Sequence, residues 1–127
     1  MKNLKIKQTK STPSVSGDVE SGLIQVIGIS IPEDAIKFYK NLINWSHRII
    51  DLNKEITFIF KLHYVNSASL HLITKMLKNI KIETKNVYVI WYYELDDEDM
   101  MEVGENISIV SKIEFEMIGI KECFKGF

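Results

Sequence analysis

Residues 55–64 alternate between two kinds of side chain, and this period of two constrains the fold more than any other feature of the chain. One set of alternate side chains is large and apolar throughout: Ile56, Phe58, Phe60, Leu62 and Tyr64. A β-strand points successive side chains to opposite faces of a sheet, so the pattern predicts a strand with one buried and one partly hydrated face. Such a sheet needs helices on one face only, which predicts a two-layer architecture.

The strand leads into a polar corner and then an amphipathic helix. The corner consists of small side chains: Asn66, Ser67, Ala68 and Ser69. Apolar side chains then recur at helical spacing: Ile73, Met76, Leu77 and Ile80. The first N–H groups of a helix have no partner within the helix, so they can donate to a capping side chain or to an anion. From the residues alone, Asn66 or Ser67 is predicted as the N-cap, and the corner, chiefly at Ser67, is a candidate anion site.

Apolar patterns elsewhere predict a second long helix and further strands. Ser30 and Glu33, with Pro32 in the first turn, form a capping-box pattern that opens a helix through residue 50. Strands are expected at residues 23–29, 87–93 and 107–118, with a short edge strand within 2–8 whose lysines would protect it from unwanted pairing. Residues 11–14 are expected to form a turn, because they contain a proline. The chain is therefore predicted to be one α/β domain over residues 1–127, with about five strands and helices mainly on one face.

Composition narrows the classes of function. The 127 residues are 46% hydrophobic and 26% charged, which is ordinary for a globular protein. The net charge of −1 gives no strong attraction to nucleic acid or to an anionic membrane. No apolar run approaches the roughly 18 residues of a membrane span, and no signal peptide is evident. The lone Cys123 excludes an intramolecular disulfide and fits a reducing compartment, so a cytoplasmic protein is expected.

Residues 94–105 carry seven carboxylates and allow three interpretations. Asp96, Asp97 and Asp99, with the tyrosines nearby, would serve a small enzyme or a metal- or ligand-binding protein, although their spacing does not match an EF-hand loop. The segment would alternatively be a solvated patch that docks a basic partner. The preferred interpretation is structural: Asp96 or Asp97 caps a short helix that ends at Gly104, because acids favour the first turn.

No sequence pattern favours an enzyme. A phosphate-binding glycine loop and the common hydrolase and zinc-protease motifs are not found. His63 has no histidine or cysteine at metal-ligand spacing, and Cys123 has no recognisable base beside it. Enzyme activity is therefore disfavoured, and no metal or cofactor is expected. A purely structural scaffold subunit is a further alternative.

Several stretches together resemble the SiaC-type regulatory phosphoproteins. They are residues 11–13 (STP), 30–33 (SIPE), 64–69 (YVNSAS), 91–94 (WYYE), 96–100 (DDEDM) and 102–105 (EVGE). The resemblance implies a mixed sheet with helices, like that of the anti-sigma-factor antagonists (the STAS-like class). It also implies a switch, in which a kinase phosphorylates a hydroxyl at the corner and a PP2C-type phosphatase removes the phosphate. The unmodified form would bind and activate a GGDEF diguanylate cyclase, which raises cyclic di-GMP and promotes biofilm formation.

The resemblance can be carried onto individual residues of the corner. The family's corner typically reads Asn-Thr-Ser-Ser with threonine as the acceptor, so Ser67 is the expected phosphoacceptor and Ser69 the alternative. Contacts with the partner are expected at the same corner: Asn66, Ser67, Ala68, Ser69 and His71. A phosphate adds about −1.5 to −2 charge, which a helix N-terminus tolerates and a partner packed over the corner does not. Exposed edge strands would permit a homodimer.

Overall fold

A computed structural model describes residues 1–52 and 54–121 of the chain. The strands are β1 (Leu4–Ile6), β2 (Ser14–Gly17), β3 (Leu23–Ser30), β4 (Ile56–Val65), β5 (Val87–Glu94) and β6 (Phe115–Ile120), and the helices are α1 (Ala35–Asp51), α2 (Ser67–Glu83) and α3 (Glu98–Ser111). Within the described residues these six strands form one sheet in chain order. β1 to β3 pair antiparallel and β3 to β6 pair parallel.

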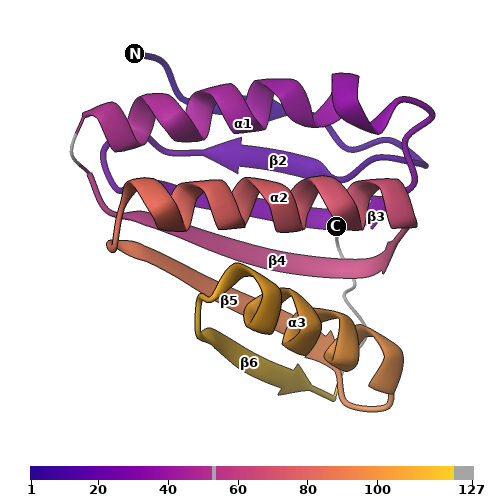
Figure 1. Ribbon diagram of the computed structural model, residues 1–127. Coiled ribbons are helices and arrows are strands. Elements are labelled where there is room, and N and C mark those ends of the chain that lie inside the picture. The colour runs from indigo at the N-terminus through magenta and orange to yellow at the C-terminus, as the bar shows by residue number, and fades with distance from the viewer. Residues whose placement is uncertain (53, 122–127) are drawn as a thin grey trace.

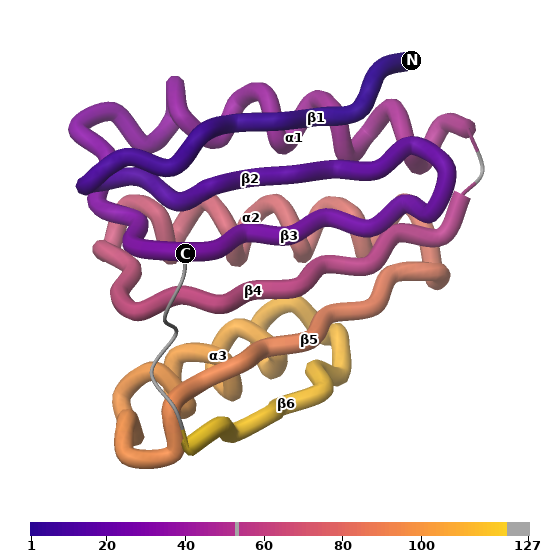
Figure 2. The backbone as a smooth tube through the Cα atoms, turned by 180° about the vertical axis from the view of Figure 1, so that it is seen from behind, coloured from indigo at the N-terminus to yellow at the C-terminus, as the bar shows by residue number. Residues whose placement is uncertain are grey.

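The sheet carries its helices on one face. α1, α2 and α3 all lie in front of the sheet in Figure 1, and the view from behind in Figure 2 shows the strands with no helix over them. Each helix forms one of the three parallel crossovers, between β3 and β4, β4 and β5, or β5 and β6. The predicted two-layer mixed α/β class is confirmed, with six strands in place of about five.

The core lies between the sheet and the helices. The alternating residues of β4 supply its centre, where the rings of Phe58 and Phe60 lie 5.8 Å apart. Trp91 on β5 packs beside Phe60 and Phe115, with ring centroids 5.4 and 6.2 Å away. α1 adds Tyr39 and other residues of its apolar stripe, as its sequence predicted. Of the helices in the described part of the chain, none is long and apolar enough to cross a membrane.

The C-terminal third differs from the sequence prediction. Residues 107–118 were expected to form one strand, but α3 continues to Ser111 and β6 begins only at Phe115. Gly104, expected to end the helix, lies in its interior and packs against Trp91. The true end is Lys112, which adopts a left-handed conformation with φ of 60°. This segment forms a helix and not a strand because its buried residues repeat at helical spacing: Met100, Gly104, Ile107 and Ser111.

Two further expectations near the N-terminus are wrong. The predicted capping box at Ser30 and Glu33 does not form, because Ser30 is the buried last residue of β3. α1 begins later, and its N-cap is Asp34, whose carboxylate accepts the Lys37 N–H at 3.1 Å. Ser14, expected to end the turn at residues 11–14, is instead the first residue of β2, a strand that was not predicted and that pairs with both β1 and β3.

The alternation of β4 changes phase near its end. Tyr64 was predicted on the buried side, yet it is 56% exposed. Gly28 of β3 is opposite Leu62, but the next residue, Ile29, is opposite Tyr64, so His63 is an extra residue on β4. This bulge turns Tyr64 outward and Val65 inward. The bulge thus sets the direction in which the chain enters the corner.

Candidate functional site

The corner between β4 and α2 is fixed to the end of β3. Val65 pairs with Ser30 across the two parallel strands, and the Asn66 N–H donates to the Ser30 carbonyl at 2.9 Å. The Asn66 side chain accepts the Ser69 N–H at 2.9 Å, so Asn66 is the N-cap and Ser67 is the first residue of α2. Of the two predicted N-caps, Asn66 is therefore the correct one.

The two candidate serines have opposite environments. Ser67 and Ala68 are exposed at the start of α2. Ser69 is 0% exposed, and its hydroxyl lies 2.8 Å from the Ser30 hydroxyl and 3.4 Å from the Ser30 carbonyl. An enzyme that modifies a hydroxyl needs direct access to it. Only Ser67 of the two offers that access in this structure.

A buried hydroxyl network lies beneath the corner. The Tyr39 hydroxyl lies 2.6 Å from that of Ser30, which in turn contacts Ser69, so the network joins α1, β3 and α2. Burial raises the pKa of Tyr39, although its hydrogen bonds to the two serines act in the opposite direction. The sequence predicted Tyr39 only as part of the apolar stripe of α1. Phe38 and Trp45 belong to the same stripe, but a buried tyrosine hydroxyl usually has a hydrogen-bond partner, and this was the signal for the network.

Replacing Tyr39 with phenylalanine is expected to make the protein less sensitive to alkali. The pKa of Tyr39 in the folded state lies above its ordinary value of 10.0, so the unfolded chain releases this proton first. The stability that this difference provides is complete below pH 10.0 and is lost as the pH rises through the folded-state pKa. Urea unfolding from about pH 7 to about pH 11 should show that the free energy of unfolding falls less steeply with pH for Tyr39→Phe than for the unmodified protein. At neutral pH, the variant should be less stable by about 1 kcal/mol, because it lacks the hydrogen bond of the tyrosine hydroxyl.

The matched control for this titration is the exposed Tyr88. Tyr88→Phe should keep the alkaline decline of the unmodified protein. An identical pH profile for Tyr39→Phe and the unmodified protein would contradict the assignment of this decline to Tyr39.

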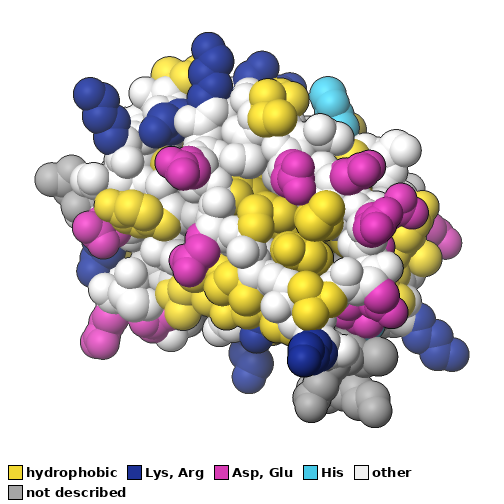
Figure 3. Space-filling model, turned by 90° about the horizontal axis from the view of Figure 1, so that it is seen from below, with side chains coloured by type: hydrophobic (Ala, Val, Ile, Leu, Met, Phe, Trp, Pro, Cys, Tyr) yellow, Lys and Arg dark blue, Asp and Glu magenta, His cyan; other side chains and the backbone are white. Residues whose placement is uncertain are grey.

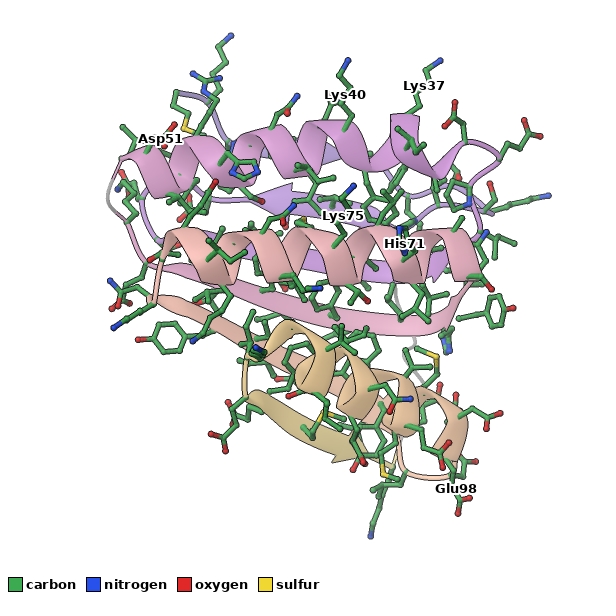
Figure 4. The ribbon with its side chains drawn as sticks, viewed as in Figure 1. Lys37, Lys40, Asp51, His71, Lys75 and Glu98 are labelled. Atoms are coloured by element: carbon green, nitrogen blue, oxygen red, sulfur yellow. The ribbon has the colours of Figure 1, made fainter. Side chains whose placement is uncertain are left out.

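A hollow of about 420–470 Å³ lies on each side of the exposed ridge of α2. The hollow toward α1 includes Ala68, the residue after Ser67, and is lined also by Leu72, the 72% exposed Ile36 and the acidic Glu33 and Asp34. His71 and Lys75 line both hollows, and Figure 4 shows them on α2. The surface next to the corner therefore combines exposed apolar groups with basic and acidic ones. Such a surface suits a protein partner better than a small polar ligand.

The acidic segment serves as a helix start. The Asp97 carboxylate accepts the Met100 N–H at 3.1 Å, and Glu98 and Asp99 occupy the first turn of α3. This confirms the prediction that Asp96 or Asp97 caps a helix. Across residues 1–52 and 54–121, no group of three or more histidine, cysteine or acidic side chains could hold a metal ion. Cys123 lies outside the described residues.

Comparison with known proteins places this fold in one family. The sequence model of the SiaC family regulatory phosphoprotein matches residues 6–120. An uncharacterized protein of Pseudomonas aeruginosa strain UCBPP-PA14 is 28% identical over 109 residues, which are 83% of this chain and 86% of that protein. Apo-SiaC from Pseudomonas aeruginosa superposes with a TM-score of 0.81 at 25% identity, covering 93% of this chain and 99% of that one.

A second solved structure extends the likeness of fold. The crystal structure of the diguanylate cyclase SiaD in complex with its activator SiaC, also from Pseudomonas aeruginosa, contains a chain that superposes with a TM-score of 0.86. That match is 24% identical and covers 92% of this chain and 99% of the other. The family match spans strands β2 to β6, all three helices and the corner. The chain belongs to the SiaC family of regulatory phosphoproteins.

Proposed function

We propose that this protein is a phosphorylation-switched activator of a diguanylate cyclase, acting in the cytoplasm, and that Ser67 is its phosphoacceptor. The observation that carries the proposal is that Ser67 is exposed at the first position of α2, whereas Ser69 is fully buried. A kinase would add the phosphate, and a PP2C-type phosphatase would remove it. The SiaC of the solved complex is named as the activator of a diguanylate cyclase, and this supports the choice of partner.

A phosphate on Ser67 is compatible with the fold. Ser67 stands at the N-terminus of α2, where unpaired N–H groups and the positive end of the helix dipole favour a negative charge. His71 is exposed one turn further along the same face, where it can approach the phosphate. Neither interaction requires the backbone of the corner to move. Phosphorylation should therefore change the charge of this surface and leave the fold in place.

The same phosphate is incompatible with a partner that covers the corner. The hollow beside Ser67 exposes Ile36, Leu72 and Ala68, which a partner would bury with apolar groups of its own. Burying a phosphate in such an interface without a cationic partner costs several kcal/mol, and about 1.4 kcal/mol corresponds to a tenfold change in affinity. We therefore expect phosphorylation to weaken partner binding by about a hundredfold or more.

The decisive experiment is to install phosphoserine at position 67 and measure binding to the diguanylate cyclase of the source organism by calorimetry. Ser67→Ala should bind like the unmodified protein, whereas phosphoserine at 67 should abolish measurable binding and cyclase activation. Ser16→Asp, which adds charge at an exposed serine on β2, is the matched control and should bind normally. Equal affinity with and without phosphate at 67, with circular dichroism unchanged, would overturn the proposal. Phosphopeptide mapping of protein from its own cells should place the phosphate on Ser67.

A further inference from the structure

The two edges of the sheet differ in how well they are protected. β1 spans three residues, and the flanking and central lysines Lys2, Lys5 and Lys7 are all exposed. β6 spans six residues, and its last four, Met117–Ile120, carry no charge. Short, lysine-bearing edges resist pairing with other chains, whereas long uncharged edges invite it. In the described part of the chain, β6 pairs with β5 and with no other strand.

Only part of the β6 edge is available for further hydrogen bonds. The Ile120 carbonyl accepts the Leu95 N–H at 2.9 Å, so Ile120 directs its backbone groups toward β5. Alternate residues of a strand point their backbone groups in opposite directions, so Met117 and Gly119 point theirs away from the sheet. Phe115 also points away, but its N–H already donates to the Ser108 hydroxyl of α3 at 3.1 Å. Met117 and Gly119 are therefore the two residues of β6 that offer both an N–H and a C=O to another strand.

Apolar side chains accompany these free backbone groups. Leu95, beside the end of β6, is 53% exposed, and Met117, Ile118 and Ile120 are each half-buried. Figure 3, which views the molecule from the side of β6 and α3, shows hydrophobic side chains gathered at the centre of this face, with acidic side chains and some lysine or arginine side chains around them. An apolar patch with a polar rim at an open sheet edge is typical of a protein–protein interface.

We propose that a second copy of this chain docks on this edge, with the two β6 strands antiparallel across a two-fold axis. Such an axis, perpendicular to the sheet, keeps the helices of both copies on the same side. The two Ile118 residues then face each other across the axis, and Met117 of one copy faces Gly119 of the other. Each Met117–Gly119 pair exchanges two hydrogen bonds, so the free N–H and C=O groups of these two residues are satisfied in both copies.

Backbone groups and side chains both select this register. Moving the axis to Met117 would pair Gly119 with Phe115, whose N–H is already held by Ser108. With Ile118 on the axis, the bulky Met117 is opposite a glycine, which leaves room for its side chain. The isologous arrangement is also the commonest form of protein dimer. A closed dimer covers both open edges and leaves the lysine-bearing β1 edges outside.

Charged side chains of both signs surround this edge. Exposed carboxylates lie on α3 (Glu98 and Glu105), just before β6 (Glu114) and on β6 (Glu116), and the exposed Lys121 follows the last residue of the strand. In the antiparallel register, Lys121 of each copy lies opposite Phe115 of the other, next to Glu114 and Glu116. Acidic and basic groups of the two copies therefore lie near one another at both ends of the paired strands.

Cross-linking tests the register directly. In a Cys123→Ser background, Ile118→Cys should form a disulfide-linked dimer under mild oxidation, because residues facing each other on the axis have Cα atoms about 4.5 Å apart, within the range of a disulfide. Glu116→Cys in the same background is the matched control. Its side chain lies on the same face of β6, but its counterpart is four residues out of register, so it should remain monomeric.

Sedimentation equilibrium of the unmodified chain supplies the second measurement. From about 10 μM to about 1 mM, the mass should rise toward twice that of the chain. Ile118→Lys, checked by circular dichroism, should abolish this rise. A monomer at every concentration, or equal cross-linking at 116 and 118, would overturn the proposal. These measurements use the chain alone, so their outcome is independent of the proposed function. A dimer would present two Ser67 corners to its partner.

Discussion

Replacing Ser69 with aspartate is expected to leave little folded protein at room temperature. The side chain of Ser69 is 0% exposed, and its hydroxyl contacts the hydroxyl and the carbonyl of Ser30. A carboxylate at this position would be repelled by the carbonyl oxygen, and its negative charge would be buried without a cation. Burying an unpaired charge costs about 3–5 kcal/mol or more, which is comparable to the whole stability of about 5–15 kcal/mol of a small domain.

The matched control for this change is Ser67→Asp, two residues earlier on the same turn. There the carboxylate is exposed at the start of α2, where an acidic group typically stabilises a helix by about 0.3–1 kcal/mol. Urea unfolding followed by circular dichroism should therefore separate the two variants by several kcal/mol. If Ser69→Asp were as stable as Ser67→Asp, Ser69 would have to be accessible, and the choice of Ser67 as phosphoacceptor would lose its basis.

The corner could be located from the sequence, and the family resemblance favoured Ser67 there, but the residues alone could not show that Ser69 is buried. The strand pattern that ends near Val65 and the helical spacing after Ser69 bracket the corner, because both depend on neighbouring residues. The burial of Ser69 depends instead on Ser30 and Tyr39, which are distant in sequence and meet it only because β3 pairs with β4. The exposed Ile36 beside Ser67 was missed for the same reason, since it was assigned to the core stripe of α1.

Errors in the fold prediction also trace to contacts between distant elements. The expected strand at residues 107–118 rested on an apolar alternation, and Ile107 and Ile113 are indeed both buried. They belong to different elements, because Lys112 reverses the chain between α3 and β6. Gly104 was taken as a helix end, since glycine often follows the last turn. Its role is instead to let α3 approach the ring of Trp91, which local sequence cannot reveal.

Replacing Gly104 with valine is expected to destabilise the protein strongly, by about 3 kcal/mol. A Cβ atom at this position would lie 2.5 Å from the Trp91 ring, closer than atoms can approach without movement. Trp91 has little freedom to retreat, because it is 1% exposed and stacks between Phe60 and Phe115. Its indole N–H also donates to the Met100 carbonyl at 2.9 Å, so any shift of the ring breaks a buried hydrogen bond.

The neighbouring exposed position separates this clash from the intrinsic effect of valine in a helix. Glu105→Val introduces the same side chain on the solvent side of α3, where β-branching lowers helix propensity by roughly 0.5 kcal/mol. Urea unfolding should thus give a far larger loss for Gly104→Val than for Glu105→Val. Equal losses would mean that α3 can move away from β5 at little cost. In that event the Trp91 contact would not be what fixes α3 on the sheet, and the position of the β6 edge beside α3 would be adjustable as well.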